Sequence, residues 1–119
     1  MVELQTISSH VDNARQEGDA VILTLHGEID LHGSPDLRTD LLALLQQTGS
    51  KKLVLVLSKV PYVDSSAIAI MVECLQRLRK IGGKLCLVDP QPRVKGLIEI
   101  ARLNTLFNVV GTEAEALAA

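Results

Sequence analysis

Aromatic residues are scarce in this chain. They make up 2% of its 119 residues, as Tyr62 and Phe107, and tryptophan is absent. Proteins that hold single-stranded nucleic acid stack the bases on aromatic side chains in a positively charged groove. Because the chain also has a formal net charge of −2, its composition argues against a nucleic-acid partner. Its core must be built from aliphatic residues.

Cysteine and long apolar runs are also in short supply. The two cysteines, Cys74 and Cys86, lie inside apolar runs, where we expect small buried hydrophobic residues. A disulfide between them is the less favoured alternative. No apolar run approaches the roughly 18–20 residues that a membrane-spanning helix needs, and we find no secretory leader. We therefore expect a soluble, cytoplasmic protein with no membrane contact.

Aliphatic residues are what the chain has in abundance. Hydrophobic residues account for 47% of the sequence, which is enough to build a core. The length suits a single domain that spans residues 1–119. Strands alternate with helices in the predicted order: strands at 2–9 and 20–26, a helix from Ser34 to about Thr48, a strand at 53–57, a helix from Ser65 to Gly82-Gly83, a strand at 84–89, a helix from Pro92, an edge strand at 106–110 and a terminal helix from Thr112.

Two local signals refine this order. The polar segment 10–19 ends in a Gly-Asp turn signal, which predicts a hairpin of the first two strands. Ser34 is a suitable N-cap, and Pro35 suits the first helical position. The whole pattern predicts an α/β domain with a mixed β-sheet of four to five strands packed with about four helices. The loops 27–33 and 62–66 should meet at one edge of that sheet, where partner sites usually lie.

The stretch VPYVDSSAIAIMV places three polar residues, Asp64, Ser65 and Ser66, where a buried strand ends and a helix begins. One interpretation is helix capping, in which a side-chain oxygen accepts a hydrogen bond from the first turn. The other is a phosphoacceptor serine at a helix N-terminus, where free N–H groups and the helix dipole tolerate a phosphate. From the spacing alone, capping is the favoured interpretation.

Longer segments carry a family resemblance. The segment LVLVLSKVPYVDSSAIAIMVECLQRLRKIGGKLCLVDPQPRVKGLIEIARLNTLFNVV resembles the STAS domain of bacterial anti-sigma factor antagonists, and LTLHGEIDLHGSPDL resembles the part of that family around its G-E-[IL]-D motif. The similarity runs from about Ala20 to the end of the chain. It rests on the order of GEID, VDSS and GG rather than on any one motif.

The resemblance implies a regulatory binding protein and not an enzyme. In that family the unphosphorylated protein binds an anti-sigma factor that is also a serine kinase of the histidine-kinase-like ATPase fold, and binding releases a sigma factor. The kinase then phosphorylates the serine after the aspartate, which corresponds to Ser65. A serine phosphatase of the metal-dependent class removes the phosphate. Neither ATP nor the metal would bind this chain, so no cofactor is expected.

The implied partner-binding residues surround the same turn. Asp30 and Asp64 match acids on the partner-facing edge of the family, and the expected contacts are Asp30, Asp64, Ser65, Ser66, Ala67 and Ile70. Ile70 lies at the flank of the apolar arc of its helix, so it belongs either to the core or to the interface, and we favour the interface. The family usually has glycines where this chain has Ala67 and Ala69, which stiffens the start of the helix.

Other functions find less support. STAS-like domains also serve as subunits of lipid or anion transport assemblies, which is the alternative function. Glu28 and Asp30 form an acidic pair, but no nucleophile or metal-ligand cluster accompanies them. His10, His26 and His32 are scattered without metal-binding spacing. A stand-alone enzyme is therefore the weakest hypothesis.

Overall fold

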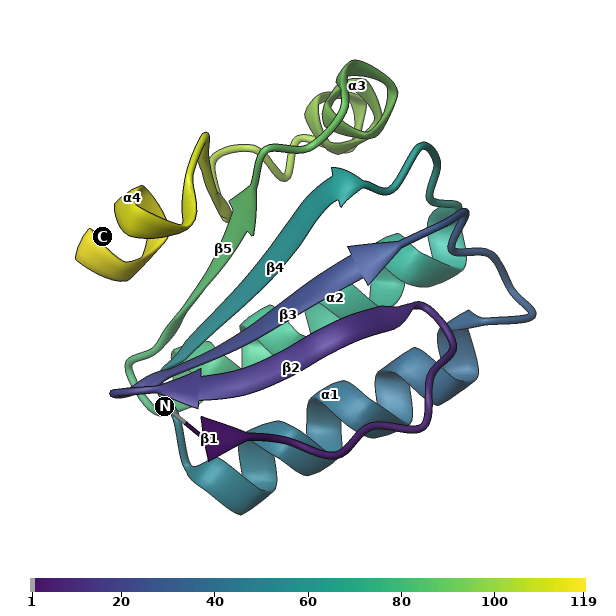
Figure 1. The fold of residues 1–119 in the computed structure, drawn as a ribbon. Helices are drawn as coiled ribbons and strands as arrows, with labels where there is room; N and C mark the ends of the chain where they lie inside the picture. Colours follow the sequence, from purple (N-terminus) through teal and green to yellow (C-terminus); the bar gives the residue numbers. More distant parts are fainter. Residues whose placement is uncertain (1) are drawn as a thin grey trace.

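A computed structural model describes residues 2–119 and shows a six-stranded mixed sheet with the strand order β1-β2-β3-β4-β5-β6 (Figure 1). The α/β fold of the prediction is confirmed, with more strands than the four to five expected. Antiparallel pairing joins β1 to β2 and β2 to β3, and all later neighbours are parallel. The strands are β1 (Val2–Glu3), β2 (Val11–Glu17), β3 (Ala20–His26), β4 (Lys52–Lys59), β5 (Lys84–Val88) and β6 (Asn108–Val110).

The N-terminal hairpin differs from the prediction. The expected strand at 2–9 is reduced to the two residues of β1, and most of the segment 10–19, predicted as a polar connection, forms β2. The turn at Gly18 is where the sequence placed it, with φ of +59°. The sequence pattern did not predict β2 because Ala14 is the only buried residue of this strand. The strand therefore lacks the alternation of apolar and polar residues that marks a half-buried strand.

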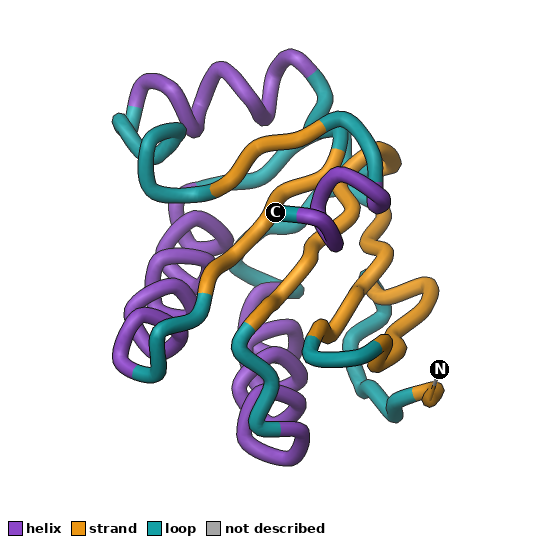
Figure 2. The backbone as a smooth tube through the Cα atoms, turned by 90° about the vertical axis from the view of Figure 1, so that its left-hand side faces the viewer, coloured by secondary structure: helices purple, strands orange, loops and turns teal. Residues whose placement is uncertain are grey.

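Four helices pack on this sheet within residues 2–119: α1 (Ser34–Thr48), α2 (Ser65–Lys80), α3 (Pro92–Ile100) and α4 (Glu113–Ala118). The first three share one aliphatic core with one face of the sheet. Helix α4 covers a smaller cluster around Ile22, Val54 and Cys86 on the opposite face (Figure 2). Both cysteines are buried and free, as expected. No described helix combines the length and the apolar character required to span a bilayer.

The helix ends follow the sequence signals with one exception. Helix α1 stops at Gly49 in the left-handed conformation, and α4 is capped by Thr112, whose hydroxyl oxygen accepts from Glu115 N–H at 3.1 Å. The prediction of Ser34 as an N-cap is wrong. Gly33 occupies the cap position and Ser34 is the buried first residue of α1, so Pro35 is the second helical residue and not the first as predicted. The Ser34 hydroxyl donates to Ser66 Oγ of α2.

Candidate functional site

Two loops meet at the edge of the sheet where β3 and β4 end, as the sequence predicted. Ile29 and Val63 form an isolated parallel bridge. Ile29 N–H donates to the Tyr62 carbonyl at 3.0 Å, and Asp64 N–H donates to the Ile29 carbonyl at 3.2 Å. These bonds extend the pairing of β3 and β4 beyond the strands. They fix the GEID loop beside the start of α2.

Asp64 is the N-cap of α2. Its Oδ1 accepts from Ser66 N–H at 2.9 Å, from Ala67 N–H at 3.3 Å and from the Ser66 hydroxyl. The bond from the Ser66 hydroxyl is the main reason that the pKa of Asp64 lies below its usual value, and backbone N–H groups of Ala67, Ser66 and Leu31 add to the effect. Asp64 therefore remains an anion at neutral pH and is fixed at the positive end of the helix dipole.

A chain of hydroxyls connects the two helices. The Ser34 hydroxyl donates to the Ser66 Oγ at 2.9 Å, and the Ser66 hydroxyl donates to Asp64. Ser34 belongs to α1 and Ser66 to α2, so this chain fixes one helix start against the other. Ser66 thus has a structural role, and its hydroxyl is already engaged.

Ser65 differs from its neighbour. It is the first residue of α2, its side chain is exposed, and its hydroxyl forms no hydrogen bond with any residue in 2–119. The N–H groups of Ser66 and Ala67, which the sequence interpretation left free for a phosphate, are taken by Asp64. A group attached to Ser65 Oγ would therefore project into solvent beside a carboxylate, and it would displace no contact of the fold.

Asp30 organises the other loop. Its Oδ1 accepts from His32 N–H at 2.9 Å and from Gly33 N–H at 3.4 Å, while its side chain remains 48% exposed. Gly33 lies so close to His10 that a Cβ atom at position 33 would be 2.3 Å from His10 Nε2. The loop is thereby held in a shape that leaves the Asp30 carboxylate near the surface.

Two of the expected contact residues face inward. Ala67 is 1% exposed and Ile70 is 6% exposed, and both belong to the main core. The preference for Ile70 as an interface residue is therefore not supported by its position, because its helical register directs it at the sheet. Of the six expected contacts, the four polar ones gather at the surface, and Ala69 is exposed beside them.

Two exposed apolar residues near the start of α2 were not identified from the sequence. Leu31 follows Asp30 and is 70% exposed, and Ile100 at the end of α3 is 82% exposed. Ile100 borders a hollow of about 270 Å³ between α2 and α3, to which Tyr62, Ser65 and Leu97 also contribute. The sequence signal for an exposed Leu31 was its position in a predicted loop, between Asp30 and His32. The pattern of α3 gave no such signal for Ile100.

The site has the features of a binding surface. No group of three or more His, Cys, Asp or Glu residues within 2–119 is arranged to hold a metal ion. The surface offers two carboxylates, one unengaged hydroxyl and exposed aliphatic side chains around a hollow. Such a combination suits recognition of a protein, with apolar anchors and a polar rim.

Comparisons with known proteins agree with this description. The family model for the STAS domain matches residues 12–116. The anti-sigma-B factor antagonist of Bacillus subtilis is 30% identical over 100 residues, which cover 84% of this chain and 89% of that protein. A crystal structure of a Thermotoga maritima protein superposes with a TM-score of 0.83 at 25% identity, over 88% of this chain and 90% of the other. The Bacillus cell fate determinant SpoIIAA in its phosphorylated form has a TM-score of 0.71 at 20% identity, over 88% and 95% of the two chains.

Proposed function

The chain belongs to the STAS domain family, with anti-sigma factor antagonists among its relatives, and on that premise we propose that it is an anti-sigma factor antagonist switched by phosphorylation of Ser65. In its unphosphorylated form it binds an anti-sigma factor and so releases a sigma factor. The partner proposed here is also a serine kinase of the histidine-kinase-like ATPase fold. A metal-dependent serine phosphatase would reverse the modification.

The observation that carries the proposal is the state of the Ser65 hydroxyl. It is exposed at the first residue of α2 and has no hydrogen-bond partner within residues 2–119. A kinase can therefore reach it without unfolding the helix. Ser66 offers a contrast, because its hydroxyl lies between Ser34 and Asp64. Modification there would remove the proton that Ser66 donates to Asp64 and would place a phosphate beside Ser34.

The charge of the surface explains how one phosphate would act. Transfer of the γ-phosphoryl group of ATP to Ser65 Oγ releases the hydroxyl proton and leaves ADP. The product carries about −1.5 to −2 additional charge. The added charge would lie beside the Asp64 carboxylate, whose lowered pKa keeps it ionised. An acidic or apolar partner surface that fits the neutral serine would lose its contacts, while the fold would keep its own.

The exposed apolar residues would supply affinity. Leu31 and Ile100 lie on the surface near the GEID loop and the hollow beside Ser65. Covering aliphatic side chains of this kind with a partner is favourable because it removes apolar surface from water, although the affinity does not scale simply with the buried area. Affinity and switching would thus reside in different atoms of one surface.

The test combines modification and binding. The protein is incubated with its cognate kinase and ATP, and the modified residue is located by mass spectrometry, with Ser66→Ala as a control that keeps Ser65. We expect a single phosphate on Ser65, none on Ser65→Ala, constitutive binding by Ser65→Ala and weaker binding by Ser65→Asp. A phosphate on another residue, or phosphoprotein that binds as tightly as before, would contradict the proposal.

The identity of the bound partner tests the alternative function. Affinity purification from the native host should recover an anti-sigma factor kinase together with this chain. Recovery of a permease and a transport ATPase instead would favour a subunit of a lipid or anion transport assembly.

A further inference from the structure

A second hollow lies between the later turns of α1 and α2, far from Ser65. Its volume is about 350 Å³, at the lower end of the roughly 300–1,000 Å³ typical of small-molecule sites. Arg77, which borders it, is twelve residues along α2 from Ser65, or about 18 Å at the helical rise. We call this hollow the α1–α2 groove; it is lined by Leu42, Leu45, Gln46, Ser50, Arg77, Leu78 and Ile81.

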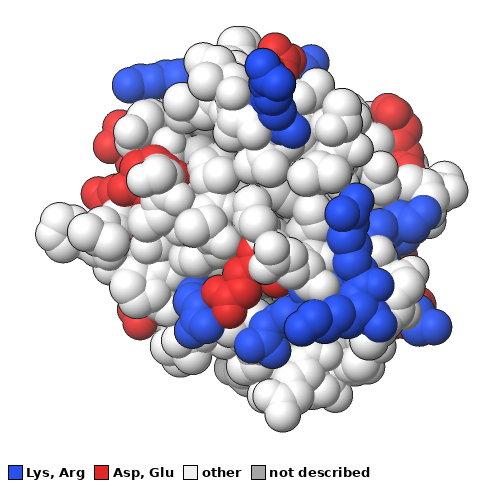
Figure 3. All heavy atoms as spheres, turned by 180° about the vertical axis from the view of Figure 1, so that it is seen from behind, with Lys and Arg blue, Asp and Glu red and all other residues white. Residues whose placement is uncertain are grey.

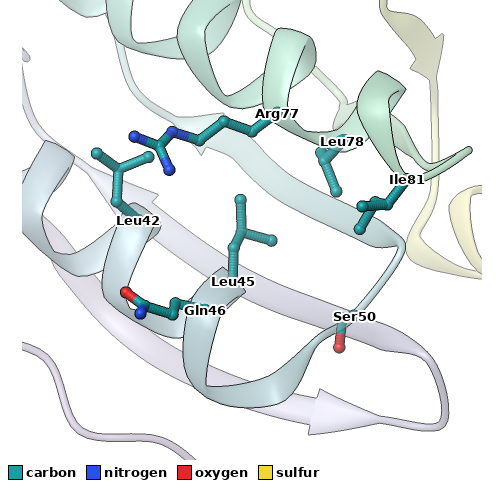
Figure 4. Close-up of a pocket in the computed structure, with 7 residues that line it drawn as sticks. All are labelled: Leu42, Leu45, Gln46, Ser50, Arg77, Leu78 and Ile81. Atoms are coloured by element: carbon teal, nitrogen blue, oxygen red, sulfur yellow. The ribbon is translucent and has the colours of Figure 1, made fainter.

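The walls of the groove are aliphatic. Leu45 points from α1 toward α2, and Leu78 and Ile81 lie on the opposite side (Figure 4). Ile81 is 48% exposed although it borders this apolar surface. None of the groove residues is aromatic, so a flat ring would find no stacking partner. An aliphatic chain fits these walls better than a nucleotide or another aromatic ligand.

One side of the groove is positively charged. Arg77 extends from α2 toward Leu42 of α1 across the opening (Figure 4). The last turn of α2 carries Arg77, Arg79 and Lys80, and blue basic side chains gather toward one side of the face shown in Figure 3. None of the residues that line the groove is acidic. The groove is therefore complementary to an anion with an apolar tail.

Arg77 forms one long ion pair, with Glu73 one turn earlier on α2. Both carboxylate oxygens of Glu73 accept hydrogen bonds from Arg38 at 2.7 Å, whereas Arg77 Nη2 lies 3.9 Å from Glu73. Arg77 donates no hydrogen bond to any residue in 2–119. A guanidinium can bind a carboxylate through two parallel N–H groups, and here that capacity is unused.

We propose that the α1–α2 groove binds an aliphatic carboxylate, with the carboxylate on Arg77 and the acyl chain along Leu45, Leu78 and Ile81. The site is separate from the surface around Ser65 and does not depend on the function proposed for it. Gln46, which lines the groove from α1 (Figure 4), adds an amide to its lining.

The test uses sodium decanoate, below its micelle concentration, as the probe. Titration is followed by methyl and amide NMR shifts. We expect saturable shifts at Leu42, Leu45, Leu78 and Ile81, with little change at Ser65. Decyltrimethylammonium, which has the same chain and the opposite charge, should produce no saturable shifts. A wild-type protein that fails to bind decanoate, or binds the cation equally well, would overturn the proposal.

Matched variants locate the head group. Arg77→Gln should weaken decanoate binding about tenfold, equivalent to ~1.4 kcal/mol, while Arg79→Gln should leave it unchanged because Arg79 is in the same turn but does not line the groove. Ile81→Ser should also weaken binding, through lost apolar contact. Thermal unfolding confirms that each variant is folded. If both arginine variants weakened decanoate binding equally, the effect would come from general surface charge. That result would contradict a site at Arg77.

Discussion

The two ends of α2 are both open to solvent, yet they are built in opposite ways. At the first turn, the side chain of Asp64 satisfies backbone N–H groups and leaves the hydroxyl of Ser65 unused. At the last turn, backbone geometry at Gly82 and Gly83 stops the helix, and the guanidinium of Arg77 remains without a hydrogen bond to any residue in 2–119. Both ends complement the helix dipole, with an acid at the start and bases at the end.

The comparison shows how one helix can present two different surfaces. Where side chains terminate the helix, a substitution there changes both stability and surface chemistry. Where backbone geometry terminates the helix, the neighbouring side chains are not needed to end it and can contact other groups. The C-terminal end should therefore depend on glycine for stability, and the N-terminal end on Asp64 and Ser66.

The largest loss of stability is expected at the C-terminal end of α2, where Gly82 and Gly83 stop the helix. A Cβ atom on Gly83 would lie 2.3 Å from the Lys51 carbonyl oxygen, and backbone cannot move aside as a flexible side chain can. Gly83→Ala should lower the free energy of unfolding by about 3 kcal/mol, measured by urea denaturation. Gly82→Ala is the control, because it has φ of +75° but open space, and it should cost about 1–2 kcal/mol. Equal losses would contradict the close approach at Gly83.

The next largest loss of stability is expected at the N-terminal end of α2, at Asp64. Asp64→Ala removes the acceptor of two backbone N–H groups and one hydroxyl, and we expect a loss of about 1.5 kcal/mol. Asp64→Asn keeps a capping oxygen, so it should lose less. Urea denaturation at pH 7 measures both. If the alanine variant were as stable as the asparagine variant, the cap would not stabilise α2.

The same aspartate predicts a pH dependence. The pKa of Asp64 is lowered in the folded protein, chiefly by the bond from the Ser66 hydroxyl. The stability that this carboxylate contributes is therefore complete above its unfolded pKa of about 3.9 and is lost as pH falls through the lower folded pKa. Between pH 5 and acid unfolding, wild type should lose more stability than Asp64→Asn. Parallel pH profiles for the two proteins would exclude this contribution.

Adjacent serines at this end should differ in their effect on stability. Ser66→Ala removes the link between Ser34 and Asp64 and should cost about 1 kcal/mol. Ser65→Ala removes a hydroxyl that bonds to no residue in 2–119 and should change stability by less than about 0.5 kcal/mol. Thermal and urea unfolding compare the two proteins. A costly Ser65→Ala would mean that its hydroxyl supports the fold and is a poor position for a switch.

Much of this architecture could be predicted because the signals are local. The apolar runs gave β3, β4 and β5, and the polar triplet gave the start of α2. The chain order of strands and helices placed the GEID loop beside Asp64, since successive parallel strands end at one edge of a sheet. These features follow from periodicity and turn chemistry within short windows.

The remainder depends on contacts between distant residues. Ser34 was predicted to cap its own helix, but its hydroxyl bonds to Ser66, 32 positions away. The strand β2 has a mostly polar sequence, and its pairing with β3 and β1 stabilises it. The burial of Ile70 and the exposure of Ile100 are set by how α2 and α3 pack on the sheet. A helical pattern alone could not distinguish them.

Two exposed isoleucines allow the surfaces at the two ends of α2 to be compared directly. Ile100 is 82% exposed beside the hollow at Ser65, and Ile81 is 48% exposed beside the α1–α2 groove. Ile100→Ser should weaken binding of the anti-sigma factor about fivefold, or ~1 kcal/mol, because an apolar contact is lost at the proposed interface. Calorimetric titration with the anti-sigma factor measures this change in affinity.

Ile81→Ser is the matched control, since it makes the same chemical change at the other end of α2. It should leave anti-sigma factor affinity unchanged while it weakens decanoate binding. Because both side chains are substantially exposed, neither variant should unfold, so a change in affinity reports on the surface and not on the fold. If Ile81→Ser weakened the partner as much as Ile100→Ser, the interface would extend along the whole helix, and the two ends would not be separate surfaces.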